Sequence, residues 1–225
     1  MSGAAPGMPA GGGIAIALSA IRAGRTVLMI DDLGDRTIGV LVTAAGHVTV
    51  DAVKFMATVA RGPVCVAMRA ALLDALEIPP ADVPVPGNGR TVFRAPVDLA
   101  TATAPAASAE GRAETVRALV DIRSAAGDFI RPGQVVPIEC DAGAPAWGGI
   151  AEAAADLAEL AGLTPAGVLC PVRGPDGGFA RGFELAGLSR GARLPVVAVS
   201  GLIEYRRRYR ADRRDTESAP PMPEG

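Results

Sequence analysis

Apolar positions in the first third of the chain follow two periods in turn. Spacings of three and four residues predict helices, and short continuous apolar runs predict buried strands. On this basis helices are expected over residues 14–23 and 50–61, and strands over residues 26–30, 38–43 and 64–68. Gly24 and Gly62 follow the two helices directly, and glycine commonly ends a helix. Two helix-strand units are therefore predicted here.

The rest of the chain continues the alternation after a loop. Residues 78–90 contain four prolines and two glycines, which predict a surface loop without a regular element. Helices are then expected over residues 108–122, 152–161 and 201–210, and strands over residues 91–99, 134–138, 167–172 and 194–199. Ser108 is the predicted N-cap of its helix, and Arg131-Pro132-Gly133 is the predicted turn into the next strand.

This order of elements predicts one α/β domain, because helices and strands that alternate along a chain usually pack as layers around a sheet. The sequence contains no internal repeat and no domain linker. The Gly-, Ala- and Pro-rich residues 1–12 are expected to form a flexible leader, residues 13–210 the single domain, and the Pro-rich residues 211–225 a disordered tail.

Composition supports a globular protein and excludes several classes of function. Hydrophobic residues make up 49% of the chain, enough for a sizeable core. A net charge of −2 and 4% aromatic residues argue against nucleic-acid binding, which needs a basic surface and stacking side chains. His47 is the only histidine, so a site with two imidazoles is excluded, and the three cysteines lack the paired spacing of a zinc site.

No stretch of the sequence is suited to cross a membrane. Gly, Pro or charged residues interrupt every apolar run before the roughly 20 residues that a membrane span requires. The first residues also lack the basic segment of a signal peptide. We therefore expect a soluble, cytoplasmic protein with reduced thiols and with neither membrane nor nucleic acid as a partner.

Several separated motifs resemble one enzyme family. They are VLMIDDLGDRTIGVLV at 27–42, GPVCV at 62–66, FIRPGQ at 129–134, EAAADLAELAGLTPAGVLC at 152–170, and the pairs Asp176-Gly177 and Ala180-Arg181. Over roughly residues 14–209 the chain resembles 3,4-dihydroxy-2-butanone 4-phosphate synthase of riboflavin biosynthesis. The resemblance implies a three-layer α-β-α domain with a mixed sheet, a homodimer, and a magnesium-dependent conversion of ribulose 5-phosphate into formate and a four-carbon phosphate.

The same resemblance indicates where the chain departs from the family pattern. Ile38 and Ile150 stand where the family has a metal-binding Glu and a metal-binding His, and Ala151 replaces a phosphate-binding Thr. The other replacements are Arg36, Val40 and Pro171 for acids, Gln134 for a His, and Trp147 for a phosphate-holding Arg. Hydrocarbon side chains offer magnesium no oxygen, and most of these residues cannot exchange protons near neutral pH, so metal binding and proton transfer are expected to fail.

The largely apolar replacements favour a cavity re-lined for an uncharged small molecule. The leading hypothesis is a repurposed, metal-independent enzyme without a cofactor, which rearranges, cyclises, eliminates or condenses a non-phosphorylated, largely apolar substrate of specialised metabolism. The predicted catalytic residues are Asp31, Asp32, Asp35, Arg36, Cys65 and Glu152, and the predicted substrate-binding residues are Ile38, Val40, Gln134, Trp147, Ile150, Ala151 and Pro171. The alternatives are a catalytically silent homologue acting as a binding or regulatory partner, and the authentic synthase.

Most of these residues also have a simpler interpretation. Cys65 is either a reactive thiol with a lowered pKa or a small core residue. The aspartates after the first strand are either a general acid or base, or a solvated turn. Glu152 suits the start of a helix without any catalytic role. Trp147 is either a core anchor, or a residue of a pocket or dimer interface.

Overall fold

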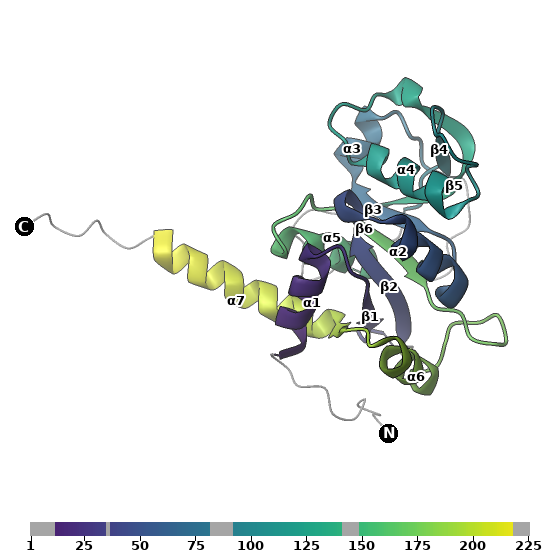
Figure 1. Cartoon of the computed structure of the whole chain (residues 1–225). Helices are drawn as coiled ribbons and strands as arrows, with labels where there is room; N and C mark the ends of the chain where they lie inside the picture. The colour runs from purple at the N-terminus through teal and green to yellow at the C-terminus, as the bar shows by residue number, and fades with distance from the viewer. Residues whose placement is uncertain (1–11, 35–36, 82–91, 141–148, 218–225) are drawn as a thin grey trace, which may run out of the picture.

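Helices cover both faces of one sheet (Figure 1). The computed structural model describes residues 12–34, 37–81, 92–140 and 149–217. Within these residues one seven-stranded sheet has the order β4-β5-β3-β6-β2-β1-β7. Its strands are β1 (Val27–Asp31), β2 (Ile38–Ala44), β3 (Cys65–Arg69), β4 (Val97–Leu99), β5 (Phe129–Cys140), β6 (Gly167–Pro171) and β7 (Val196–Ala198).

The sheet is mixed. β1 runs parallel to β7, and β3 runs parallel to β5. The remaining neighbours, β1 with β2, β2 with β6, β6 with β3 and β4 with β5, are antiparallel. This arrangement confirms the predicted α/β class with a mixed sheet.

The described residues contain seven α-helices. They are α1 (Gly12–Arg22), α2 (Val50–Phe55), α3 (Ala70–Ala75), α4 (Ala109–Leu119), α5 (Ile150–Leu160), α6 (Gly182–Ala192) and α7 (Val199–Glu217). Beyond its first turns α7 projects away from the sheet (Figure 1). A π-helical turn (Met56–Ala60) continues α2, and 3-10 turns cover Ala45–His47 and Ala126–Asp128. None of the helices in the described ranges is long and apolar enough to cross a membrane.

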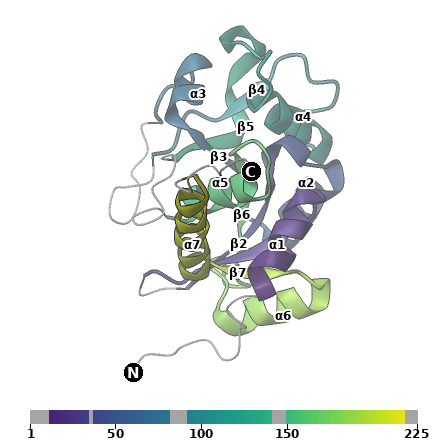
Figure 2. The same cartoon turned by 90° about the vertical axis from the view of Figure 1, so that its left-hand side faces the viewer.

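Two separate cores make the fold a three-layer structure. One core packs Ile21 of α1, Leu157 of α5 and Leu202 of α7 onto one face of the sheet. The other packs Val53 of α2 and Val116 of α4 onto the opposite face. In Figure 2, α1 and α7 lie toward the viewer, in front of the sheet. The predicted three-layer arrangement is thus confirmed.

Side-chain caps fix the starts of two helices. The Ser108 hydroxyl accepts a hydrogen bond from the Gly111 amide at 3.0 Å, which confirms Ser108 as the N-cap of α4. Thr49 caps α2 in the same way, through the Ala52 amide at 3.1 Å. Such caps satisfy amides that have no partner within the helix.

The predicted turn at Arg131-Pro132-Gly133 is wrong. These residues lie inside β5, a 12-residue strand, and the Arg131–Pro132 peptide bond is cis. Gly133 passes so close to the Val97 backbone that a β-carbon would overlap it. The register between β4 and β5 shifts at this point. A sequence pattern that usually marks a turn is here a bend within a continuous strand.

Other differences concern the ends and number of elements. The strand expected over residues 91–99 is reduced to β4, with isolated bridges at Phe93 and Arg94, while residues 82–91 lie outside the described ranges. α3 and α6 were not predicted. α7 continues to Glu217, beyond the expected end at residue 210. Most of the predicted leader lies outside the described residues, and the domain division stays a prediction.

Candidate functional site

The strand register gathers most of the predicted site residues at one end of the sheet. Asp31 pairs with Ile38, Val40 pairs with Pro171, and the start of β3 lies beside the end of β6. We call this end, formed by the carboxyl ends of β1 and β6 and the amino ends of β2, β3 and β5, the site edge. The strand residues of the site, though far apart in sequence, therefore meet here through β-pairing.

Four predicted substrate-binding residues and one predicted catalytic residue belong to one apolar core and are called here the apolar cluster: Ile38, Val40, Ile150, Ala151 and Cys65. Val40, Cys65 and Ala151 are buried in the core beneath α5, and Ile38 and Ile150 pack against that core while still partly exposed. The structure therefore places predicted site residues from β2, β3 and the first turn of α5 in one core, and their roles stay predictions. Gln134 and Pro171 lie on β5 and β6 at the same end, Gln134 being exposed.

The two aspartates after β1 have different surroundings. Asp32 is exposed, and its carboxylate accepts hydrogen bonds from the Ser200 amide at 2.9 Å and from the Ser200 hydroxyl. Asp32 therefore ties the end of β1 to the first turn of α7. Asp31 is half-buried and accepts a bond only from the Leu33 amide, at 3.2 Å, among the described residues. Asp31 thus keeps a carboxylate oxygen available.

Glu152 stabilises the start of α5. Its carboxylate accepts a hydrogen bond from the Gly149 amide at 2.7 Å, the reciprocal half of a capping arrangement. The negative charge also lies in the first helical turn, where the helix dipole favours it. These contacts account for Glu152 in the way that the simpler interpretation of the sequence proposed.

Cys65 is a buried thiol. It is 2% exposed, and burial, with a smaller contribution from nearby Cys170, raises its pKa to about 12. Its Sγ lies 3.8 Å from the Pro63 carbonyl, to which it donates. The pKa of Cys170 is likewise raised by burial, to about 11. A reactive thiol needs the opposite shift, so the geometry favours the core interpretation of Cys65.

Three predicted site residues, Asp35, Arg36 and Trp147, lie outside the described residues, and their roles stay predictions. Of the predicted site, the described part therefore consists of the apolar cluster, Gln134, Pro171, and the carboxylates of Asp31, Asp32 and Glu152.

The described residues do not fit the magnesium ion that the resemblance implies. Magnesium prefers oxygen ligands in octahedral order. Ile38 and Ile150, at the positions that the resemblance assigns to metal ligands, are hydrocarbons that pack against the core. Within the described ranges no group of three or more His, Cys, Asp or Glu side chains could hold a metal ion. The described side chains of the site edge therefore do not by themselves form a magnesium site.

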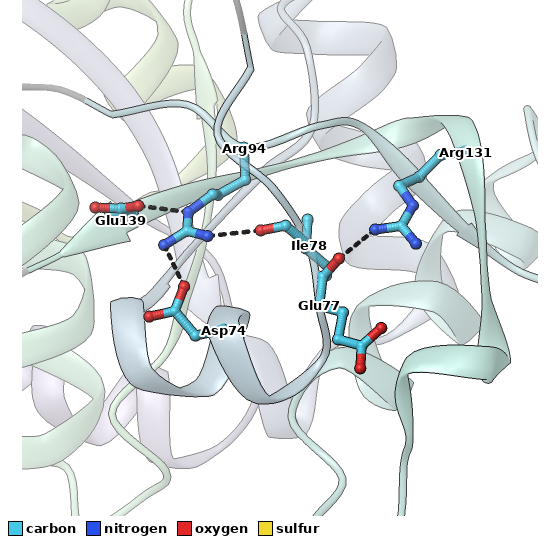
Figure 3. Close-up of polar contacts among 6 residues, drawn as sticks. All are labelled: Asp74, Glu77, Ile78, Arg94, Arg131 and Glu139. Carbon is cyan, nitrogen blue, oxygen red and sulfur yellow. Dashed lines mark hydrogen bonds and ion pairs between the residues drawn. The ribbon is translucent and has the colours of Figure 1, made fainter.

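A buried arginine that the sequence analysis did not single out lies at the other end of β5 (Figure 3). The Arg94 side chain is 7% exposed and forms ion pairs with Asp74, at 2.8 Å, and with Glu139. It also donates to the Ile78 carbonyl at 2.6 Å, and Arg131 donates to the Glu77 carbonyl beside it. A lone arginine in the apolar run VFRAPV was the available signal. This cluster joins α3 to β5.

Comparisons with known proteins extend over nearly the whole fold. The profile of the 3,4-dihydroxy-2-butanone 4-phosphate synthase family matches residues 15–205. A protein of that name from Agrobacterium fabrum is 38% identical over 190 residues, covering 84% of this chain and 89% of its own. The crystal structure of the synthase of Candida albicans superposes with a TM-score of 0.76 at 30% identity, covering 85% of this chain and 96% of its own.

Longer relatives match over part of their length. The riboflavin biosynthesis protein RibBA of Endomicrobium trichonymphae is 37% identical over 194 residues, which cover 85% of this chain and 48% of that protein. The chain thus spans about half the length of this curated relative, and 35% of the RibBA protein of Synechocystis.

These findings contradict the leading hypothesis from the sequence, a repurposed metal-independent enzyme for an apolar substrate. The named relatives are two riboflavin biosynthesis proteins RibBA and a 3,4-dihydroxy-2-butanone 4-phosphate synthase, at 36% to 38% identity over 84% or more of this chain. That hypothesis was inferred from a few replaced side chains, which weigh less than similarity spread over the entire fold. The loss of activity that it implied is likewise unsupported.

Proposed function

Because the chain belongs to the 3,4-dihydroxy-2-butanone 4-phosphate synthase family, a family of biosynthetic enzymes, we propose that it forms 3,4-dihydroxy-2-butanone 4-phosphate from ribulose 5-phosphate for riboflavin biosynthesis. The observation that carries the proposal is the 38% identity to a synthase of that name, 89% of which this chain covers. The proposal rests on this relationship and not on the polar side chains of the described site, which supply fewer groups than the family pattern.

Within this proposal Asp31 is the proton acceptor. It is half-buried at the carboxyl end of β1, and only the Leu33 amide occupies its carboxylate among the described residues. The carboxylates of Asp32 and Glu152 already accept backbone hydrogen bonds at the starts of α7 and α5. Ile38, which pairs with Asp31, and the rest of the apolar cluster would exclude water from the reacting carbons.

The remaining expectations about partners accompany this proposal. A small-molecule substrate and a homodimer are both implied by the family resemblance. The cytoplasmic location and the absence of nucleic-acid and membrane partners are predictions from composition.

Formate release from ribulose 5-phosphate tests the proposed function. The purified full-length chain should release formate at a rate proportional to its concentration, in assays with magnesium and, separately, with excess chelator. Replacing Asp31 by Asn should lower that rate by roughly 10² or more, because a positioned acid or base contributes at least that factor. Asp51→Asn is the matched control, since Asp51 is an exposed carboxylate on α2 away from the site edge.

Two results would overturn parts of this proposal. Formate production no faster than in the absence of protein, at every magnesium concentration, would exclude the synthase reaction. Full activity of the Asp31→Asn variant would exclude Asp31 as the proton acceptor while leaving the reaction itself in place.

A further inference from the structure

A groove lies at the end of the sheet opposite to the site edge. Its volume is about 400 Å³, within the range of small-molecule sites. The start of β1, the first turns of α2, and the connection from α6 to β7 line it. This groove uses none of the residues that the sequence analysis or the proposed function assigned to the active site.

The lining is cationic. It contains Arg25 and Arg193 and no acidic side chain. Both arginines are exposed, and neither guanidinium has a hydrogen bond or ion pair with any of the described residues. By contrast, Arg94 and Arg206 each bind two carboxylates. Two unpaired guanidiniums in one hollow create a positive potential that attracts an anion.

The backbone at Arg193 is also unusual. Arg193 follows the end of α6 in the left-handed conformation, with φ of 52° and ψ of 40°. Glycine or asparagine is the ordinary residue at such a position, because a side chain there is unfavourable. Local strain of this kind is often found where a side chain serves a ligand. Here it accompanies a guanidinium that lines the groove.

The rest of the lining is mostly apolar and would contact an uncharged part of a bound ligand. Ala52, Phe55, Leu194 and Pro195 provide apolar surface. Thr49 lines the groove as well, and since its oxygen accepts from the Ala52 amide, its hydroxyl proton is free to be donated. The hollow therefore combines two guanidiniums and a hydroxyl with an apolar wall.

We propose that this groove binds a small organic phosphate, with the phosphate held by Arg25 and Arg193 and an apolar group packed against Phe55 and Leu194. Arginine suits this role because its planar fork of donors matches phosphate geometry. The assignment is independent of the proposed function, since the groove and the site edge lie at opposite ends of β1.

Calorimetric titration of the full chain with phenyl phosphate tests the proposal. One equivalent should bind, and Arg25→Ala and Arg193→Gly should each weaken binding by about tenfold or more, as expected for loss of charge-assisted hydrogen bonds. Arg193→Gly also relieves the left-handed backbone, so this variant should fold at least as well as the parent. Arg190→Ala, which removes an exposed charge from the same helix outside the groove, should change affinity less than twofold.

Inorganic phosphate and phenol separate the two halves of the ligand. Both should bind more weakly than phenyl phosphate if the groove recognises the charged and apolar parts together. Equal binding of phenyl phosphate by the parent and both arginine variants would overturn the proposal. Equal affinity for inorganic and phenyl phosphate would overturn the assignment of an organic ligand. Failure of the formate assay with intact phenyl phosphate binding would affect only the proposed function.

Discussion

The two ends of strands β3 and β5 are stabilised in different ways. At the site edge, Cys65, Val40 and Ala151 are held by apolar packing, and the nearby carboxylates of Asp32 and Glu152 cap helices. At the opposite end, buried Arg94 binds two carboxylates and a carbonyl. The site edge is therefore stabilised mainly by apolar packing, and the opposite end by buried ion pairs and hydrogen bonds.

Because of this difference, substitutions at the two ends should change the free energy of unfolding by different amounts. A buried ion pair that loses one partner leaves an uncompensated charge. Substitutions among packed apolar side chains destabilise instead by steric overlap or by leaving cavities. Changes at the Arg94 end should therefore alter the free energy of unfolding most, and changes at the site edge should have smaller effects on folding. Four predictions test this contrast, in order of decreasing effect.

Replacing Arg94 by Met should have the largest effect, a loss of about 3 kcal/mol in the free energy of unfolding, because Glu139 and the Ile78 carbonyl lose a buried partner. Urea unfolding followed by circular dichroism measures the change. Arg123→Met, which removes an exposed ion pair with Asp121, is the control and should leave the midpoint unchanged. Equal midpoints for both variants would show that the buried pairing contributes nothing.

Replacing Gly39 by Ala should destabilise the site edge by about 2 kcal/mol, because the new methyl group would overlap Leu185 of α6. The same unfolding experiment detects it. Combined with Leu185→Ala, which by itself leaves a cavity in the core, Gly39→Ala should cost less than it does alone, since the side chain that the methyl group meets is gone. Additive effects of the two substitutions would contradict the contact.

Replacing Glu152 by Ala should cost about 1 kcal/mol, the usual value of a helix N-terminal cap, because the Gly149 amide loses its acceptor. Glu152→Gln should retain most of the stability, since its side-chain oxygen can still accept. A loss of formate production in the Gln variant without any loss of stability would assign Glu152 a catalytic role instead.

Ionisation of the buried thiols should have the smallest effect on the free energy of unfolding near neutral pH. Folding raises the pKa of Cys65 from 9.0 to about 12, so its thiol stays protonated and should not react with a disulfide reagent at pH 8 until urea unfolds the chain. Above pH 9 the unfolded thiol loses its proton and the folded thiol keeps it, so stability falls as pH rises toward 12.

Comparison of Cys65→Ala with the parent isolates this contribution. The variant should lose less stability than the parent between pH 8 and pH 10. Rapid labelling of native Cys65 at pH 8 would instead support the reactive interpretation.

Much of the fold could be predicted from the sequence because its elements carry local signals. The apolar run of β3 and the Ser108 cap of α4 each identify an element without knowledge of its neighbours. The full length of β5 could not be predicted, because the strand continues through Pro132 and Gly133 only where the Val97 backbone packs against it. α6 contains Gly187 and Gly191, which obscure a helical pattern.

The sequence predicted where the site residues lie better than it predicted which of them are available for catalysis. Ile38 and Val40 are placed by the register of β1, β2 and β6, and Ile150 and Ala151 join them through the packing of α5 on the sheet. Which carboxylate stays available depended on contacts across the fold. Asp32 accepts a hydrogen bond from Ser200, 168 positions away in sequence, and no local sequence pattern predicts that bond. Likewise, Arg25 and Arg193 share a groove only because β1 pairs with β7.

The two outermost strands, β4 and β7, have three residues each. An exposed strand border with free amides and carbonyls can recruit the same border of another molecule, and longer borders do so more readily. Here the longest strand, β5, lies inside the sheet, between β3 and β4. The described sheet, covering strands between residues 27 and 198, therefore offers little template for intermolecular strand addition and fibril growth, despite a composition in which nearly half of the residues are hydrophobic.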